Sequence, residues 1–189
     1  MVIESTRNET VKRARALAQR KGRLEQGVHF IEGEKLVREA VVSGAQFVDA
    51  FIEDGHDLMA AVLSGSGANV YTVRRSVMES LTQTGTPQWV CATVKTPEQP
   101  IPEYYPAGLI VALDCVQDPG NLGTILRTAD AMGACGLLLG EGCADPYAPK
   151  PLRAAMGSIY HIPVWQGNLE NEVARLAAQR FTLVCGHLK

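Results

Sequence analysis

The sequence lacks any apolar run long enough to span a membrane, for which about 20 consecutive apolar residues are needed. It also lacks the basic and apolar regions of a secretory signal, because the chain opens Met-Val-Ile-Glu-Ser-Thr. Hydrophobic residues make up 46% and charged residues 20% of the chain, which excludes a disordered protein. These features predict a cytoplasmic globular protein without a membrane partner.

Cysteine and histidine are scarce and scattered. The cysteines are odd in number and form no Cys-x-x-Cys pair, which argues for reduced thiols and against a zinc site. They are Cys91, Cys115, Cys135, Cys143 and Cys185. Because the four histidines are dispersed as well, no metal is predicted.

Charge is distributed unevenly along the chain. The net charge is −2, yet residues 1–23 carry seven basic and two acidic side chains, which leaves the remainder at −7. A basic leading segment on a mildly acidic body favours a polyanionic partner at the N-terminal end. Charge alone is equally compatible with a solvated helix face.

The first half of the chain alternates between helical and strand patterns. Alternation of this kind favours an α/β sandwich. The predicted elements are a basic amphipathic helix over 8–20, strands over 28–31, 47–52, 70–73 and 89–94, and helices over 34–43, 57–63 and 77–81.

A proline-rich segment then separates two domains. Pro97, Pro100, Pro102 and Pro106 lie in a stretch without periodicity, which is typical of a stiff, extended connector. We therefore predict a small α/β domain over 1–96, a linker over 97–106 and a second domain over 107–189.

The second domain has the pattern of a doubly wound, mostly parallel sheet. Ligands of such sheets bind beyond the carboxyl ends of the strands. The predicted strands cover 109–113, 136–140, 161–164 and 181–185, the first of them buried on both faces, and the predicted helices cover 121–132 and 168–179.

The loop before the first of these helices carries the strongest local signal. Asp118-Pro-Gly120 predicts a turn and Asn121 a helix N-cap, and a helix start can bind an anion. Neither a dinucleotide fingerprint nor a Walker loop is present. Arg127 could reach back to hold a phosphate or ribose. On the residues alone, a surface pair with Asp130 and a plain capping role for Asn121 are the favoured interpretations.

Resemblance to a known family changes the favoured interpretations of Arg127 and Asn121. The pattern Asn-x-Gly-x-x-x-Arg-Thr-Ala-Asp-Ala-x-Gly-Ala, which begins at Asn121 after Asp-x-x-x-Asp-Pro, resembles the first signature of SpoU-type (TrmH-like) RNA 2′-O-methyltransferases of the SPOUT superfamily. The segment from Asp145 to Val164 is similar to a second conserved stretch, with Ala155 and Ser158 exchanged relative to the usual order. In the first half, Phe30-Ile-Glu-Gly33 and Thr86-Pro-Gln also resemble the family's RNA-binding domain, although Trp89 stands where glycine is common.

The resemblance implies S-adenosylmethionine as the cofactor and RNA as the substrate, ribosomal RNA before transfer RNA. It implies that Arg127 orients or deprotonates a ribose 2′-hydroxyl and that Asn121 assists, often across a dimer interface. Arginine remains protonated in proteins, so positioning is the safer role. A homodimer is expected of the complete protein.

The candidate RNA-binding residues are Arg7, Lys12, Arg23 and Arg153, with phosphate contacts giving affinity and shape or loop bases giving specificity. A structural salt bridge between Arg23 and Glu32 is an alternative of equal weight. Lys150 is interpreted as a solvated loop charge.

Two further family signatures, which build a trefoil-knotted cofactor pocket, are absent from the sequence. Cys185 and Gly186 match a loop that touches the cofactor in relatives. The knot is therefore expected to be absent or truncated and the 189-residue chain alone to be inactive. A non-catalytic RNA-binding module is the main alternative. An unrelated nucleotide-dependent α/β enzyme is a weaker one, because no phosphate fingerprint is present.

Overall fold

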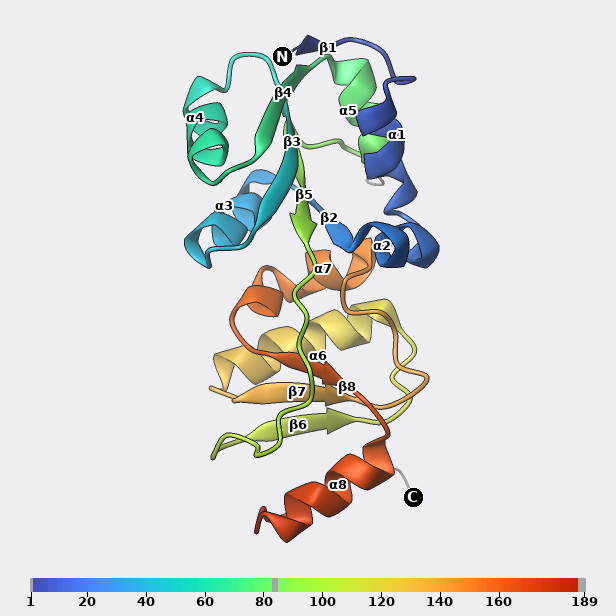
Figure 1. Cartoon of the computed structure of the whole chain (residues 1–189), viewed down its shortest axis with the longest axis vertical. Helices are drawn as coiled ribbons and strands as arrows, with labels where there is room; N and C mark the ends of the chain where they lie inside the picture. Colours follow the sequence, from blue (N-terminus) through green and yellow to red (C-terminus); the bar gives the residue numbers. More distant parts are fainter. Residues whose placement is uncertain (1, 83–84, 187–189) are drawn as a thin grey trace.

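The computed structural model describes residues 2–82 and 85–186 and shows two sheets, one in each half of the chain (Figure 1). None of the helices within these residues is both long and apolar enough to cross a bilayer. The mixed α/β class predicted from the sequence is confirmed.

The first sheet has five strands in the order β1-β4-β3-β5-β2. Strands β1, β4 and β3 are parallel, and β5 runs antiparallel to both β3 and β2. The strands are β1 (Val2–Ile3), β2 (Val28–Glu32), β3 (Phe47–Glu53), β4 (Asn69–Val73) and β5 (Val90–Lys95).

Helices cover both faces of the first sheet (Figure 1). Side chains alternate between the faces along each strand, so Ala50 and Ile52 of β3 join one core cluster and Phe51 joins the other. The first cluster includes residues of α3 (Glu34–Val42) and α4 (Asp57–Gly65), and the second includes residues of α1 (Glu9–Ala16) and α5 (Arg75–Leu81).

The single helix predicted over 8–20 is wrong, because the chain forms two helices, α1 and α2 (Arg20–Gln26). Helix ends leave backbone carbonyls without partners. Here the guanidinium of Arg23 donates hydrogen bonds to the carbonyls of Leu17 and Ala18, at 2.7 and 3.2 Å. The turn between the helices is thus stabilised by a buried side chain, which no local pattern reveals.

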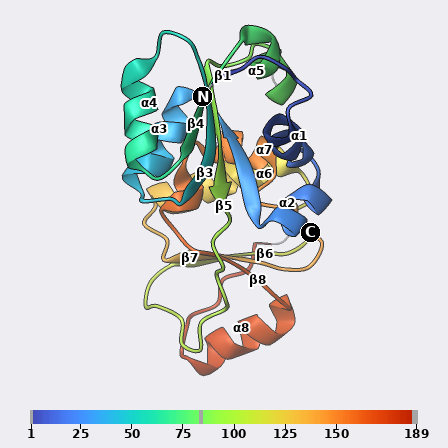
Figure 2. The same cartoon turned by 45° about the horizontal axis from the view of Figure 1, so that its top comes forward.

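The second sheet is parallel, with the order β6-β7-β8. Helices α6 and α7 lie on the side toward the first domain, and α8 lies on the far side (Figure 1, Figure 2). The elements are β6 (Ile110–Leu113), α6 (Pro119–Ala131), β7 (Gly136–Leu139), α7 (Pro149–Ala155), a 3-10 turn (Ser158–Tyr160), β8 (Val164–Gln166) and α8 (Leu169–Ala178). A parallel sheet with helices on both faces confirms the predicted architecture.

Three details of the second domain differ from the prediction. The first strand is not buried on both faces, because β6 pairs only with β7 among the described residues and Ala112 is exposed. The strand expected over 161–164 begins only at Val164, after the 3-10 turn. The segment 181–185 is not a strand, and Leu183 and Val184 are exposed.

The proline-rich linker is fastened to the second domain. The Tyr105 hydroxyl donates to Glu172 Oε2 at 2.6 Å, and Arg175 donates to the carbonyls of Pro102 and Glu103 at 2.7 and 2.9 Å. Both Glu172 and Arg175 belong to α8. These contacts hold residues 102–105 of the linker in place along α8.

The two domains share one apolar core. Ile31 and Leu36 of the first domain belong to the same cluster as Leu152, Ala155 and Ile159 of the second, and α7 packs on β2 (Figure 1). Packed interiors resist deformation, so this continuity fixes how α7 faces the first domain.

Candidate functional site

The start of α6 is organised by Asp118. This residue is the N-cap, and its Oδ1 accepts a hydrogen bond from the Asn121 backbone N–H at 2.8 Å. That bond, together with Lys150 Nζ at 3.2 Å, lowers the pKa of the Asp118 carboxyl. The predicted N-cap at Asn121 is wrong by three positions. Its side chain is instead exposed at the third residue of the helix, and Lys150 pairs with Asp118 rather than standing free in solvent.

The two stretches that resemble family signatures, one on α6 and one on α7, meet at Gly123. A Cβ atom there would lie 2.5 Å from Ala154 Cβ and 2.6 Å from the Pro151 carbonyl oxygen, both on α7. Helix backbones can approach this closely only where no side chain intervenes. Glycine at this position therefore lets α6 and α7 form a single unit.

Arg127 lies one turn beyond Gly123 and is exposed. Its guanidinium has no hydrogen bond or ion pair within residues 2–82 and 85–186. The surface pair with Asp130 does not form, because Asp130 Oδ2 contacts His161 Nδ1 at 2.7 Å. Arg127 is thus available to a ligand.

Asn121 and Arg127 do not face the same point. At 3.6 residues per turn and 1.5 Å per residue, they are separated by about 120° around the α6 axis and about 9 Å along it. Both side chains are exposed. Within one copy of the chain, the Asn121 and Arg127 side chains therefore point in different directions from α6.

His161 connects α6, the helix that carries Asn121 and Arg127, to the first domain. Its Nδ1 contacts Asp130 on α6, and its Nε2 contacts Glu39 Oε1 on α3 at 2.8 Å. Hydrogen bonds to these two carboxylates raise the pKa of His161 above 6.5. Gly157 lies against the Glu39 side chain at the same joint, with a positive φ of 107°.

Arg23 is structural, and its prediction as an RNA-binding residue is corrected. Its side chain is 7% exposed, and Nε and Nη2 donate to Asp145 Oδ2 at 3.1 and 2.6 Å. Another guanidinium nitrogen, Nη1, caps the end of α1, as described above. The suggested partner Glu32 is also wrong, since the ion pair is made with Asp145 of the second domain.

A second buried group supports the joint beside Arg23. His29 is fully buried, with Nδ1 3.1 Å from Thr96 Oγ1 and Nε2 2.9 Å from Tyr160 Oη. Burial lowers the pKa of His29 to about 3. The ring is therefore neutral and serves as a hydrogen-bonding link between the domains.

The other RNA-binding candidates lie in two places. Arg7 and Lys12 are exposed on and before α1, where Lys12 Nζ contacts Glu9 Oε1 at 2.7 Å. Arg153 lies on α7 beside the first domain. Since α2 lies between α1 and the second domain (Figure 1), the structure does not bring these residues together.

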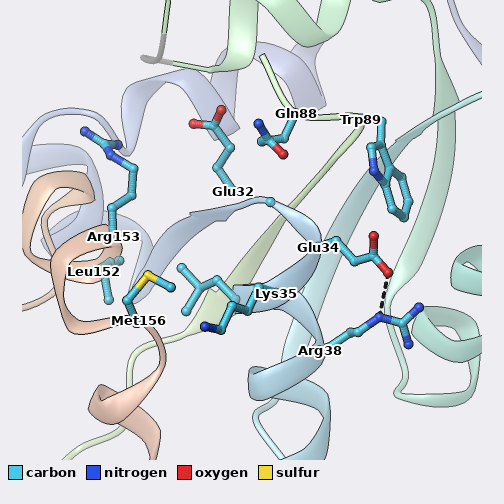
Figure 3. A pocket seen from close by; sticks show the side chains of 11 residues that line it. Glu32, Glu34, Lys35, Arg38, Gln88, Trp89, Leu152, Arg153 and Met156 are labelled. Carbon is cyan, nitrogen blue, oxygen red and sulfur yellow. Dashed lines mark hydrogen bonds and ion pairs between the residues drawn. The ribbon is translucent and has the colours of Figure 1, made fainter. Parts of the chain in front are cut away.

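A cleft of about 660 Å³ opens between α7 and the first domain. Figure 3 shows Arg153 and Met156 at one side, Trp89 and Arg38 at the other, and Lys35 between them. Trp89 is stacked on His56, with ring centroids 3.8 Å apart and planes inclined by 11°. Lys35, Arg38 and His56 were not among the predicted site residues.

Cys185 and Gly186 do not form a cofactor site among the described residues. Both are exposed, and a Cβ built on Gly186 would have nothing within 4 Å. The residues present thus do not enclose a molecule the size of S-adenosylmethionine at this point. The described residues also contain no cluster of potential metal ligands.

Comparison with known proteins agrees with the resemblance read from the signatures. Residues 8–92 match the MRM3-like substrate binding domain, and residues 108–189 match the SpoU rRNA Methylase family. A 23S rRNA guanosine 2′-O-methyltransferase of Bacillus subtilis is 37% identical over 94% of this chain and 69% of its own length. The chain belongs to the SpoU rRNA methylase family.

Two further relatives, both named as RNA methyltransferases, are also similar to this chain. An uncharacterized tRNA/rRNA methyltransferase of Synechocystis is 37% identical over 87% of this chain and 61% of its own length. The AdoMet-bound rRNA methyltransferase of Sinorhizobium meliloti superposes with a TM-score of 0.85 at 36% identity, covering 94% of this chain and 69% of that one. The chain thus spans between about three fifths and seven tenths of these relatives.

Proposed function

We propose that the protein, when it spans the full length of its relatives, transfers a methyl group to a ribose 2′-hydroxyl of RNA, with ribosomal RNA as the substrate class. S-adenosylmethionine, when bound, would supply the methyl group: its sulfur–methyl bond would break to leave S-adenosylhomocysteine. The 2′-hydroxyl oxygen would bind the methyl carbon and release its proton to solvent. The observation that carries this proposal is the joining of the two signature stretches at Gly123, which leaves Arg127 exposed and unpaired among the described residues. The named activities of the Bacillus and Sinorhizobium relatives support it.

Arg127 is assigned the positioning of the ribose. A guanidinium is a fixed fork of donors with no acceptor, so it suits holding a phosphate or ribose oxygen in line with the methyl donor. Asp130 is engaged by His161, and Arg127 makes no ion pair among residues 2–82 and 85–186.

We assign Asn121 of a second copy of the chain to the ribose that Arg127 of the first copy positions. The separation of about 120° around α6 prevents both side chains of one copy from meeting at one atom. Two copies related by a twofold axis remove this conflict. We therefore propose a homodimer for the complete protein, acting in the cytoplasm.

The RNA is proposed to contact the exposed cations Arg7 and Lys12 and the partly exposed Arg153, whereas Arg23 is withdrawn from this set because its donors are engaged. Phosphate contacts of this kind give affinity that falls with salt. A bound RNA would therefore extend from α1 over the first domain to α7.

Methylation of ribosomal RNA by the full-length protein tests this proposal, using labelled S-adenosylmethionine and mapping of the product. A 2′-O-methyl group resists alkaline cleavage of the neighbouring phosphodiester, so its position can be read directly. Arg127→Ala is expected to lower kcat/KM by at least about 100-fold, in the range seen when one stabilising donor is removed. Arg180→Asn, two residues beyond the end of α8, removes a charge and is expected to cause no such loss.

Two outcomes oppose the proposal. Methylation of a base rather than the ribose would contradict the assigned reaction. Salt-dependent RNA binding that survives Arg127→Ala, with no methyl transfer by the full-length protein, would favour the non-catalytic RNA-binding module.

A further inference from the structure

The cleft between α7 and the first domain has two walls held in a fixed relation. One wall consists of residues around the start of α3 and β5, and the other consists of Leu152, Arg153 and Met156 on α7. The hydrogen bonds of His161 with Glu39 and Asp130 join α3 to α6, and α6 is packed against α7 at Gly123. A preorganised site loses less free energy on binding than a mobile one.

Cations without partners stand on both walls. Neither Lys35 nor Arg153 has a side-chain hydrogen bond or ion pair among residues 2–82 and 85–186, whereas Arg38 is engaged by Glu34 at 2.7 Å. Figure 3 shows Lys35 and Arg153 separated across the cleft. Two unpaired cations on opposite walls are suited to successive phosphates of one nucleic-acid strand.

Trp89 adds an aromatic surface to the same cleft. His56 covers one face of the indole at 3.8 Å and thereby fixes its orientation. Gln88, next to it in the lining, carries an amide that can donate to and accept from the edge of a base. Aromatic side chains on which bases stack are the recurring element of single-strand recognition.

We propose that this cleft binds an unpaired nucleotide of the RNA substrate, with its base against Trp89 and flanking phosphates at Lys35 and Arg153. The inference rests on the proposed function and specifies the substrate as RNA that is single-stranded at this point. Arg153 lies one helical turn after Lys150, which pairs with Asp118 at the start of α6. The cleft thus leads along α7 to the signature helix.

The two tryptophans of the chain permit a direct test. Trp165 is 5% exposed and packs edge-on against Tyr105, so it reports on the interior. Trp165→Phe leaves Trp89 as the sole tryptophan, and Trp89→Phe is the matched control. A fluorophore-labelled single-stranded 10-mer oligoribonucleotide is titrated into both variants, with anisotropy following binding and tryptophan emission following contact. If Trp165→Phe fails to fold, the difference between the wild-type chain and Trp89→Phe gives the same readout.

The expected result is saturable quenching of Trp89 and no quenching of Trp165. Trp89→Ala should weaken binding about fivefold or more, which corresponds to the loss of one stacked base. Lys35→Ala and Arg153→Ala should each lower the slope of log affinity against log salt by about one. The distant Arg180→Asn variant should leave that slope unchanged.

Other outcomes overturn the cleft proposal and separate it from the proposed function. RNA binding by anisotropy without quenching, and without loss in Trp89→Ala, places the RNA elsewhere and leaves the methyltransferase proposal intact. Equal quenching by blunt duplex RNA contradicts an unpaired nucleotide. Quenching by an acidic peptide but not by RNA assigns the cleft to a protein partner. Absence of any RNA binding contradicts the proposal for the cleft and also the RNA-binding role proposed for this part of the protein.

Discussion

The two sheets of this protein differ in how completely helices and adjacent strands cover them. In the first domain, helices cover both faces, and β5 and β3 at the centre are almost completely buried. In the second, β6 pairs only with β7 among the described residues, Ala112 is exposed, and α6 presents Asn121 and Arg127 to solvent. Candidate functional residues therefore lie where the fold leaves polar side chains unengaged, and the cleft forms where the covered domain meets the open one.

The largest expected effect comes from breaking the ion pair that joins the two domains. Arg23→Met is expected to reduce the free energy of unfolding by about 3–5 kcal/mol, the usual cost of removing one member of a buried pair. Asp145, with 22% of its side chain exposed, would lose its partner, and α1 would lose its capping donor. Urea denaturation measures this change.

Arg20→Met, an exposed arginine on the same helix, is the control for that measurement and should change stability little. Equal stability of the Arg23→Met and Arg20→Met variants would show that the joint contributes nothing. Arg23 would then return to the set of candidate RNA-binding residues.

An intermediate effect is expected from filling the space between α6 and α7. Gly123→Ala places a methyl group 2.5–2.6 Å from atoms of α7 and should destabilise the protein by about 1–3 kcal/mol through overpacking. Gly65→Ala in α4 is the matched control in the first domain, because a Cβ there meets nothing within 4 Å. Alanine favours a helix over glycine, so Gly65→Ala should be neutral or slightly stabilising. Similar unfolding curves for the two variants would contradict close packing at Gly123.

The smallest effect concerns the pH dependence of the contacts by which His161 joins α3 to α6. The pKa of His161 is raised above 6.5 by Asp130 on α6 and Glu39 on α3, so the folded protein binds this proton more tightly than the unfolded chain. The stabilisation is complete below pH 6.5 and is lost as pH rises through the raised pKa. Because 37% of the side chain is exposed, it should be below about 1 kcal/mol.

Urea unfolding of the wild-type chain and His161→Gln at pH 6 and pH 9 measures that contribution. The difference between the two proteins should shrink at the higher pH. His56→Gln, which alters a histidine outside this joint, controls for the loss of an imidazole. A difference that grows with pH would contradict the assigned sign.

The sequence predicted most of the secondary structure because hydrophobic periodicity is local. Helix α3, strand β3 and helix α8 lie within one or two residues of their predicted bounds, since each buries one regular stripe or face. The strand predicted over 181–185 was wrong because this local pattern does not show whether a neighbouring strand is present. Its apolar residues resemble a strand, yet no described neighbouring strand pairs with them.

The candidate site could be predicted only in part. The residues at positions 121–134 were identified through their resemblance to a family signature, which is a local pattern in the sequence. Contacts between distant residues were not predictable. Arg23 meets Asp145 across 122 positions, and Trp89 stacks on His56 from a different element. Burial therefore changed Arg23 from a binding candidate to a structural residue, and packing made a cleft from residues without a shared motif.

Calorimetric titration of S-adenosylmethionine into a full-length version that spans the whole length of the relatives, and in parallel into the 189-residue chain, tests the central claim most directly. We expect one binding site per chain in the full-length protein and none in the 189-residue chain, because Cys185 and Gly186 are exposed and enclose nothing here. Absence of binding by the full-length protein would contradict its assignment as a methyltransferase and favour a non-catalytic RNA-binding role.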